Sequence, residues 1–349
     1  MTAAVLAIDG GNSKTDVCLI SDDGRLLGYA RGAGSNHQVV GLDAAFDVLT
    51  GLVAEAVAEA GVDEPAAVAR HGAVYLAGAD FPREVEMLLA RASLAGWAQD
   101  VSLDNDTFAL LRAGTNAANR IAVVCGAGIN CVGVSAADQV LRFPSVGAIS
   151  GDWGGGATLG TEALFLAVRA EDGRGRPTAL REAVMQHFGT ASVVDVTAAL
   201  HFGEMPRTRI YELVPVLLAV AASGDEQARA VVERMAEEVF LIARAAINRL
   251  DLRDQSTDVV LGGGVLAARH PLLMEGVSRR FEQHAPRANL LVVDDPPVVG
   301  AALLGLDALG ASPDTKSVAK AAVLDRTRTP PPLPERLSDH DQMSRKLER

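Results

Sequence analysis

The stretch "AVLAIDGGNSKTDVCLI", Ala4–Ile20, places two apolar runs on either side of a short polar turn that contains two glycines. Apolar runs of this length, bounded by glycine and polar residues, predict two β-strands joined by a tight turn. The next turn signal, "SDDGR" at Ser21–Arg25, leads into another strand-like segment at Arg25–Arg31. The chain is therefore expected to begin with three antiparallel strands in a meander.

Helices and strands alternate after this meander, and the alternation starts twice. The first set is a helix at Leu42–Ala60, a strand at His71–Gly78, a helix at Phe81–Gly96, a strand at Asp100–Asp106 and a helix at Thr107–Gly114. The second set is a pair of strands around a glycine turn at Arg120–Ser135, a strand near Val140–Phe143, a helical region from about Ala157 to Leu250, a strand at Ser256–Gly264, a helix at His270–His284, a strand at Ala288–Asp295 and a helix at Pro296–Gly310. Two halves with the same beginning predict two α/β domains of one kind.

The composition disfavours several classes of partner. The formal net charge of −12 opposes binding to a nucleic-acid backbone. The longest apolar run, Leu213–Ala222, is far shorter than the ~20 residues that cross a bilayer, and no basic signal region opens the chain. Cys18, Cys125 and Cys131 form no CxxC pair and are expected to be buried free thiols. We therefore expect a cytoplasmic protein that binds neither nucleic acid nor membrane.

Three predicted strands end in glycine-rich turns. These are "DGGNSKTD" at Asp9–Asp16, "CGAGIN" at Cys125–Asn130 and "LGGGV" at Leu261–Val265. Glycine allows backbone N–H groups to approach an anion closely, so three such turns together favour phosphate binding. None of them matches the P-loop pattern or the dinucleotide pattern GxGxxG.

The first turn contains two charged residues with a possible role at a phosphate. Lys14 is the only lysine before Lys316, and its charge suits a phosphate; the alternative is a solvated hairpin residue. Asp9 ends the preceding strand. Mg²⁺ that is bound to nucleotide phosphates takes one or two carboxylates and several waters, so Asp9 is a candidate ligand.

The segment "LDNDT" contains a second pair of acids, Asp104 and Asp106, whose side chains project to opposite sides of an extended chain. One of them can therefore enter a cleft and take a proton from a hydroxyl that attacks a phosphoryl group. The alternative is structural, because Asp106 is also well placed to cap the helix that begins at Thr107.

Two further glycine-rich motifs contain side chains that suit a sugar. In "SGDWGGGATLG" (Ser150–Gly160), Asp152 can bind hydroxyl groups and Trp153 can stack on a sugar ring; the alternative is a loop that leads into a helix. In "GSNHQVVG" (Gly34–Gly41), Asn36 can bind hydroxyl groups, although asparagine in such a turn commonly serves local structure.

These motifs, in this order and together with "VVGAALLG" at Val298–Gly305, resemble those of N-acetylglucosamine kinases in the BadF/BadG/BcrA/BcrD ATPase group of the acetate-and-sugar-kinase/actin superfamily. The resemblance covers about residues 3–310. It implies an α/β fold of two RNase H-like (actin-like ATPase) domains with an interdomain ATP cleft. The expected division is an N-terminal domain of 1–115 plus 295–312, a C-terminal domain of 116–294 with helical insertions, and a flexible tail of 313–349.

The resemblance also implies a role for each matching residue. Asp106 corresponds to the catalytic base and Asp9 to the acid on the Mg²⁺ side. The implied ATP-binding residues are Gly10, Gly11, Asn12, Lys14 and Thr15 in the first phosphate loop, Gly126, Ala127 and Gly128 in the second, and Gly262, Gly263 and Gly264 in the adenosine loop. The implied sugar-binding residues are Asn36, Asp106, Asn130, Asp152 and Trp153.

The implied activity is an ATP- and Mg²⁺-dependent kinase that phosphorylates an amino sugar such as N-acetylglucosamine or glucosamine, with the 6-hydroxyl as the expected acceptor. The chain departs from the family pattern on the sugar side: Ala127 and Ile129 stand where the family has hydroxyl residues, and Trp153 replaces a glutamate. Glucose, N-acetylmuramic acid and a cyclitol therefore stay open as acceptors. Relatives often pair, so a homodimer is a further expectation.

Two other functions stay open at this point. A dehydratase activator of the same group couples ATP hydrolysis to electron transfer through an iron–sulfur cluster and needs cysteine thiolates from each subunit. The second alternative is a non-catalytic regulator that binds ATP, because a fold does not by itself imply an activity.

Overall fold

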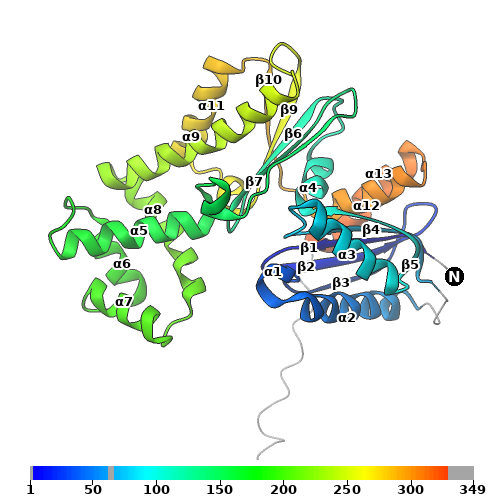
Figure 1. Cartoon of the computed structure of the whole chain (residues 1–349), viewed down its shortest axis with the longest axis horizontal. Helices are drawn as coiled ribbons and strands as arrows, with labels where there is room; N and C mark the ends of the chain where they lie inside the picture. Colours follow the sequence, from blue (N-terminus) through cyan, green and yellow to red (C-terminus); the bar gives the residue numbers. More distant parts are fainter. Residues whose placement is uncertain (1–2, 62–66, 329–349) are drawn as a thin grey trace, which may run out of the picture.

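Two five-stranded sheets with the same topology organise the structure, a computed structural model that describes residues 3–61 and 67–328 (Figure 1). The first sheet has the order β3-β2-β1-β4-β5 and the second the order β10-β9-β6-β7-β8. In each sheet the first three strands in the sequence are antiparallel, and the other two are parallel to the first. The predicted meander, the repeated set of elements and the α/β fold are therefore confirmed.

The strands have the following bounds: β1 Ala3–Gly10, β2 Lys14–Ile20, β3 Leu26–Ala33, β4 Ala69–Leu76, β5 Ala98–Asn105, β6 Arg120–Cys125, β7 Ile129–Val134, β8 Val140–Arg142, β9 Thr257–Gly262 and β10 Ala288–Val292. The α-helices are α1 His37–Val40, α2 Leu42–Ala60, α3 Pro82–Leu94, α4 Asp106–Gly114, α5 Gly155–Glu171, α6 Leu180–Phe188, α7 Val193–Phe202, α8 Leu213–Ala222, α9 Glu226–Arg249, α10 Gly264–Ala267, α11 Pro271–His284, α12 Pro297–Ala308 and α13 Pro313–Arg328. Two 3₁₀ segments are η1 Gly147–Ser150 and η2 Arg207–Glu212.

Strand β1 is buried along its whole length because helices cover both faces of its sheet. Leu6 and Ile8 join the apolar cluster formed with α2, and Val5 and Ala7 join the cluster formed with α12. A strand that is covered on both faces carries a continuous apolar run in place of an alternating one. The first sheet and the helices that pack on it form the first lobe of the molecule, and the second sheet and its helices form the second lobe. The polar groups at the end of β1, starting with Asp9, therefore lie at the boundary between the two lobes.

Helix α4 lies between the two sheets (Figure 1). Its Leu110 and Leu111 pack with residues of β6, β7 and β9 in the second lobe, while its other side packs against α12. A Cβ atom at Gly300 would lie 1.8 Å from the carbonyl oxygen of Ala109, so only glycine permits this close helix crossing. The first residue of α4, Asp106, is thus held at the junction of the lobes.

The predicted helical region at 157–250 consists of α5 to α9 and η2, and Figure 1 shows α5 to α8 extending away from the first lobe. After β10 the chain returns to the first lobe, where α12 packs on β1. The exact limits of the domains stay a prediction. No helix in the described ranges is both long enough and apolar enough to cross a membrane.

The prediction of a flexible tail from residue 313 is wrong for Pro313–Arg328, which form α13. Ala319 and Val323 are fully buried in the cluster that also contains α12. Lys316 pairs with Asp307 at 2.7 Å and Lys320 pairs with Asp295 at 2.8 Å. The apolar side of this helix is short, so composition alone does not predict it. The rest of the predicted tail, 329–349, lies outside the described residues.

Candidate active site

A cavity of about 360 Å³ lies between the lobes and collects most of the predicted site residues. Of these, it is lined by Asp9, Gly11, Asn12, Lys14, Asn36, Asp106, Gly126, Ala127, Gly128, Asn130 and Gly263. They come from the ends of strands in both sheets, so the repeated topology brings the two sets of turns together.

Asp9 provides a buried carboxylate at the wall of the cavity. Its side chain is 6% exposed, and among the described residues none donates a hydrogen bond to it. Burial raises its pKa well above the ordinary value, and the charges of Asp106 and Asp16 raise it further. A cation relieves both effects, so this acid fits a Mg²⁺ ion that arrives with nucleotide phosphates. No group of three or more His, Cys, Asp or Glu in the described ranges is arranged to hold a metal.

Asp106 is the first residue of α4, and its neighbour Asn105 caps that helix in its place. The Asn105 side chain accepts a hydrogen bond from the backbone N–H of Thr107 at 3.0 Å. The alternative in which Asp106 caps this helix is therefore wrong, and its carboxylate is left to line the cavity. Burial raises the pKa of Asp106 to about 6, against hydrogen bonds from Thr107 that lower it. The carboxylate is thus ionised at neutral pH and can accept a proton.

Lys14 lines the cavity and is tied to Asp16, a residue that the sequence reading did not single out. Its Nζ lies 2.6 Å from Asp16 Oδ2, and Arg31 Nε lies 2.5 Å from Oδ1. Asp16 is fully buried; burial opposes its ionisation, but the hydrogen bonds from Arg31 and Lys14 outweigh this and lower its pKa. Lys14 is therefore not a freely solvated hairpin residue, because a buried charge holds it at the cavity wall.

Gly10 and Thr15 lie behind the wall of the cavity and do not line it. The Thr15 hydroxyl donates to Ser35 Oγ at 2.9 Å in a buried position. A Cβ atom at Gly10 would lie 2.5 Å from side-chain atoms of both Leu76 and Ser35. In the structure these two residues serve the packing of the first turn.

The second glycine turn lines the cavity with Gly126, Ala127 and Gly128. The carbonyl groups of Gly126 and Ala127 accept hydrogen bonds from Gly156 and Ala157 at the start of α5, at 2.7 and 3.0 Å. A Cβ atom at Gly155 would lie 2.5 Å from the Gly128 backbone, so glycine is needed for the helix to start this close. The N-terminus of a helix carries a partial positive charge, which favours an anion at this turn.

In the third turn only the middle glycine lines the cavity. Gly263 has φ +81°, and a Cβ atom there would lie 2.5 Å from the backbone of Cys125. Gly262 ends β9 against Leu110, and Gly264 begins α10. The third turn therefore packs directly against the start of the second.

The predicted sugar-binding residues are divided between two neighbouring cavities. Asn36 and Asn130 line the main cavity, while Asp152 and Trp153 line an adjoining one of about 400 Å³. Asp152 Oδ2 accepts hydrogen bonds from Ser150 Oγ at 2.5 Å and from the backbone N–H of Gly147 at 3.1 Å. The two cavities share the wall formed by Ala127, Gly128, Ile129 and Ser145.

One face of the Trp153 ring is in contact with Arg234, a contact that was not predicted from the sequence. The guanidinium of Arg234 in α9 lies 4.1 Å from the centre of this ring, a cation–π distance. The face that carries Arg234 is closed to a sugar, so any stacking on Trp153 must use the other face.

Other cavity residues were also missed by the sequence reading. These are Ser13, Gln38, Ala77, Gly78, Asp80, Asn105, Thr107, Val124, Ile129, Ser145 and Pro297. Asp80 has the most unusual chemistry: burial raises its pKa to about 7, and the charges of Glu84 and Asp106 contribute. It lies four residues after the end of β4, and the rule that polar site residues follow the ends of parallel strands could have found it.

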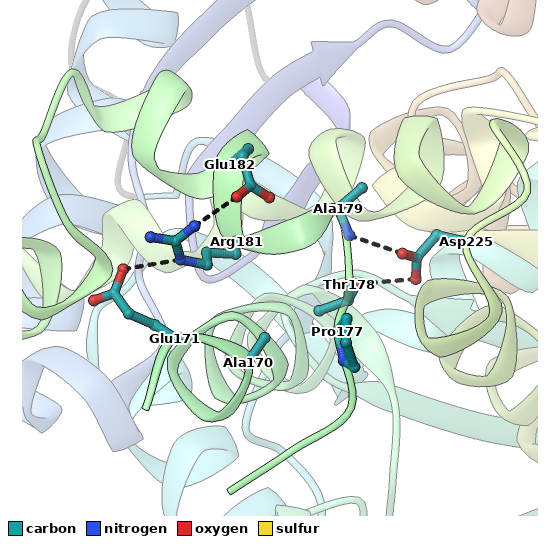
Figure 2. A pocket seen from close by; sticks show the side chains of 8 residues that line it. All are labelled: Ala170, Glu171, Pro177, Thr178, Ala179, Arg181, Glu182 and Asp225. Atoms are coloured by element: carbon teal, nitrogen blue, oxygen red, sulfur yellow. Dashed lines mark hydrogen bonds and ion pairs between the residues drawn. The ribbon is translucent and has the colours of Figure 1, made fainter. Parts of the chain in front are cut away.

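A larger cavity, of about 670 Å³, lies among the helices of the second lobe and contains no predicted site residue (Figure 2). Its acids already have partners: Asp225 accepts from Thr178 Oγ1 at 2.9 Å and from Ala179 N at 2.8 Å, and Glu171 accepts from Arg181 at 3.3 Å. These acids fix the ends of helices, so the cavity between the lobes is the better candidate for chemistry.

The three cysteines are free and buried, as predicted. Burial raises the pKa of Cys125 to about 12 and that of Cys18 and Cys131 as well, which opposes formation of thiolates. They lie inside strands β2, β6 and β7. Their placement does not suit a cluster shared between subunits, which disfavours the dehydratase-activator alternative.

Comparison with known proteins agrees with this architecture. The model of the BadF/BadG/BcrA/BcrD ATPase family matches residues 6–305. The chain is 25% identical over 314 residues to the N-acetyl-D-glucosamine kinase of Dictyostelium discoideum, covering 86% of this chain and 97% of the relative. It is also 25% identical over 264 residues to the N-acetylmuramic acid/N-acetylglucosamine kinase of Clostridium acetobutylicum, covering 75% and 85%.

A solved structure gives the same result for the fold. The crystal structure of a candidate N-acetylglucosamine kinase from Chromobacterium violaceum superposes with a TM-score of 0.70 at 25% identity, covering 87% of this chain and 99% of that one. The family match spans both sheets and the cavity between them. The chain therefore belongs to the BadF/BadG/BcrA/BcrD ATPase family.

Proposed function

We propose that this chain transfers the γ-phosphoryl group of ATP to the 6-hydroxyl of an amino sugar, with N-acetylglucosamine as the first candidate. That it is a carbohydrate kinase follows from its family and from relatives that carry this activity in their names. The observation that carries the finer proposal is the meeting of Asp9, Asp106 and the turn 126–128 in one cavity.

Asp106 is the proposed general base. With a pKa of about 6 it is ionised at neutral pH, yet basic enough to take the proton of the sugar hydroxyl as that oxygen attacks phosphorus. The turn 126–128 lines the cavity, and the partial positive charge at the start of α5, whose first amides donate to Gly126 and Ala127, favours the phosphates there. Asp9 would hold Mg²⁺, which, when bound, neutralises charge on the phosphate oxygens.

The acceptor is proposed to lie between Asn36 of the first lobe and Asn130 of the second. Both side chains line the cavity with Asp106, and amide groups suit sugar hydroxyls because they both donate and accept hydrogen bonds. The 6-hydroxyl is the primary hydroxyl of a hexosamine and therefore its least hindered acceptor. Glucosamine is the second candidate.

The test is an ADP-release assay with N-acetylglucosamine, glucosamine, N-acetylmuramic acid, glucose and a cyclitol, with mass spectrometry and NMR of the product. We expect N-acetylglucosamine 6-phosphate at the highest kcat/KM. ADP release that is independent of any sugar would support an ATPase instead, and ATP binding without ADP release would support the non-catalytic regulator.

We also propose that the enzyme works in the cytoplasm, where ATP is available and its three free thiols stay reduced. A homodimer stays a prediction, as does the lack of nucleic-acid and membrane partners. Sedimentation of the purified chain at several concentrations tests the first of these.

A further inference from the structure

Asp80 lies in the cavity with Asp106 and accepts hydrogen bonds from two side-chain amides. Asn105 Nδ2 donates to its Oδ1 at 2.9 Å, and Gln38 Nε2 donates to its Oδ2 at 3.2 Å. Its backbone N–H is held by Glu84 Oε2 at 3.1 Å, at the start of α3. The carboxylate therefore sits at a fixed place between two donors, one on each side.

The hydrogen bonds of Asn105 connect Asp80 to residues of the second lobe. Asn105 Oδ1 caps α4, whose first residue is Asp106, and it also accepts from Asn130 Nδ2 at 3.3 Å. Asn130 Oδ1 in turn accepts from Ser145 Oγ at 2.6 Å. A single chain of hydrogen bonds thus runs from Ser145 through Asn130 and Asn105 to Asp80.

The Gln38 side leads to the other proposed sugar ligand. The backbone N–H of Gln38 donates to Asn36 Oδ1 at 2.8 Å, and Asn36 Nδ2 donates to Asn12 Oδ1 at 2.6 Å. Gln38 Nε2 also donates to Glu84 Oε1 at 2.8 Å and to the carbonyl of Gly78 at 3.2 Å. The position of Asn36 is therefore coupled, through the backbone of Gln38, to a side chain that Asp80 holds together with Glu84 and Gly78.

We propose that Asp80 is a positioning residue for the acceptor sugar: it orients Asn36 through Gln38, and Asp106 and Asn130 through Asn105. This inference rests on the proposed function. Both partners present NH₂ groups, so position 80 must supply an acceptor on each side, which a carboxylate does and a carboxamide cannot. The acids that face it are Glu84 of α3 and Asp106 of α4, and their charges oppose another negative charge. The hydrogen bonds from Gln38 and Asn105 offset part of this cost, so the acid stays tied to these two side chains.

The test exchanges the donor and the acceptor between two positions. In Asp80→Asn, one NH₂ group meets another, and we expect the KM for the sugar to rise about tenfold while the KM for ATP changes less than about twofold. In the double variant Asp80→Asn/Asn105→Asp, the amide at 80 donates to the carboxylate at 105, which still accepts from Thr107 and Asn130. The sugar KM should then return to within about threefold of the wild-type value.

Asn105→Asp alone should raise the sugar KM at least as much as Asp80→Asn, because two carboxylates then face each other. Asp23→Asn, in the exposed turn between β2 and β3, is the matched control and should leave both KM values as they are. Calorimetric titration of sugar without turnover gives a second readout, and thermal melting shows that each variant is folded. If Asp80→Asn does not fold, Gln38→Ala, at an exposed position, tests the other half of the network.

A sugar KM that is unchanged in Asp80→Asn or in Gln38→Ala overturns the inference. So does a double variant that binds sugar as poorly as Asp80→Asn, because Asp80 would then contact the sugar directly. A wild-type enzyme that phosphorylates no sugar overturns the proposed function and this inference with it, whereas an active wild type with unaffected variants overturns the inference alone.

Discussion

Burial and, after it, the charge of Asp106 raise the pKa of Asp9, and both acids line the cavity between the lobes. One carboxylate ends the first strand of the chain, and the other begins the helix that follows the last strand of the same sheet. Two acids held close together in a buried place cost free energy, and such pairs are common at functional sites because a cation or a moving proton relieves the repulsion. Replacing Asp9 and replacing Asp106 are therefore expected to have different effects on activity and stability.

Asp106→Asn should remove the base and leave the site otherwise intact. We expect kcat to fall by about 10²- to 10⁴-fold, the usual contribution of a general base, with ATP affinity changed less than about twofold. Steady-state kinetics and calorimetric titration with ATP measure the two effects. Asp104→Asn is the matched control, since Asp104 lies two residues earlier and pairs with Arg142 at 2.8 Å; it should cost less than about threefold in kcat. An Asp106→Asn enzyme that turns over at the wild-type rate would rule out the assignment.

Asp9→Asn should weaken the response to magnesium and yet stabilise the empty protein. The pKa of Asp9 is raised in the folded state, so the unfolded chain releases its proton more easily and ionisation opposes folding. Asparagine removes this cost. We expect the variant without ligands to melt a few degrees higher than wild type at pH 8, with the difference vanishing near pH 4.

The same variant should need about tenfold more Mg²⁺ for half-maximal activity, because one carboxylate ligand is lost. Differential scanning calorimetry from pH 4 to pH 8 and a Mg²⁺ titration at fixed ATP measure the two effects. A variant that melts below wild type at every pH, with an unchanged magnesium requirement, would show that Asp9 is a structural residue.

The pH dependence of kcat/KM should report the ionisation of Asp106. Burial raises the pKa of this acid to about 6, and only the ionised form accepts a proton, so activity should be full above pH 7. It should fall about tenfold for each pH unit well below 6. The residual activity of Asp106→Asn should lack this limb. A wild-type profile that stays flat down to pH 5 would exclude a base with this pKa.

The fold and the chief acids could be predicted because each rests on a local pattern. Apolar runs that end in glycine turns mark both sheets; Asp9 lies at the end of the first such run, and Asp106 directly follows the strand β5. The choice of helix cap could not be predicted, because Asn105 and Asp106 both suit that role and the direction in which β5 enters α4 decides between them. The sequence pattern therefore identifies the candidate residues, but the path of the chain from β5 into α4 determines which of them caps the helix.

The contacts that complete the site come from distant parts of the chain. Arg234 covers one face of Trp153 from a helix that begins at residue 226, and Asp80 accepts a hydrogen bond from Gln38, 42 residues earlier in the chain. Such pairs depend on how distant elements pack within each lobe and leave no periodic trace in the sequence. The same holds for α13, whose ion pairs with Asp295 and Asp307 require the return of α12 to the first lobe.

Substitution of Lys14 tests whether the first glycine turn binds phosphate or contributes only to packing. Its Nζ lies 2.6 Å from the buried Asp16, so the ammonium is fixed beside the cavity. If it contacts phosphate, Lys14→Ala should raise the KM for ATP about tenfold, the loss expected for one charge-assisted hydrogen bond, and leave the sugar KM nearly unchanged. Lys14→Arg, which keeps the charge, should lose less.

The comparison variant is Asp16→Asn. It should reduce the free energy of unfolding by about 2–4 kcal/mol, because Arg31 and Lys14 lose their buried partner, and urea unfolding measures this change. It should also raise the KM for ATP, since Lys14 is then no longer fixed. The opposite pattern, in which Lys14→Ala lowers stability and leaves the KM for ATP unchanged, would mean that this lysine serves only as the partner of Asp16.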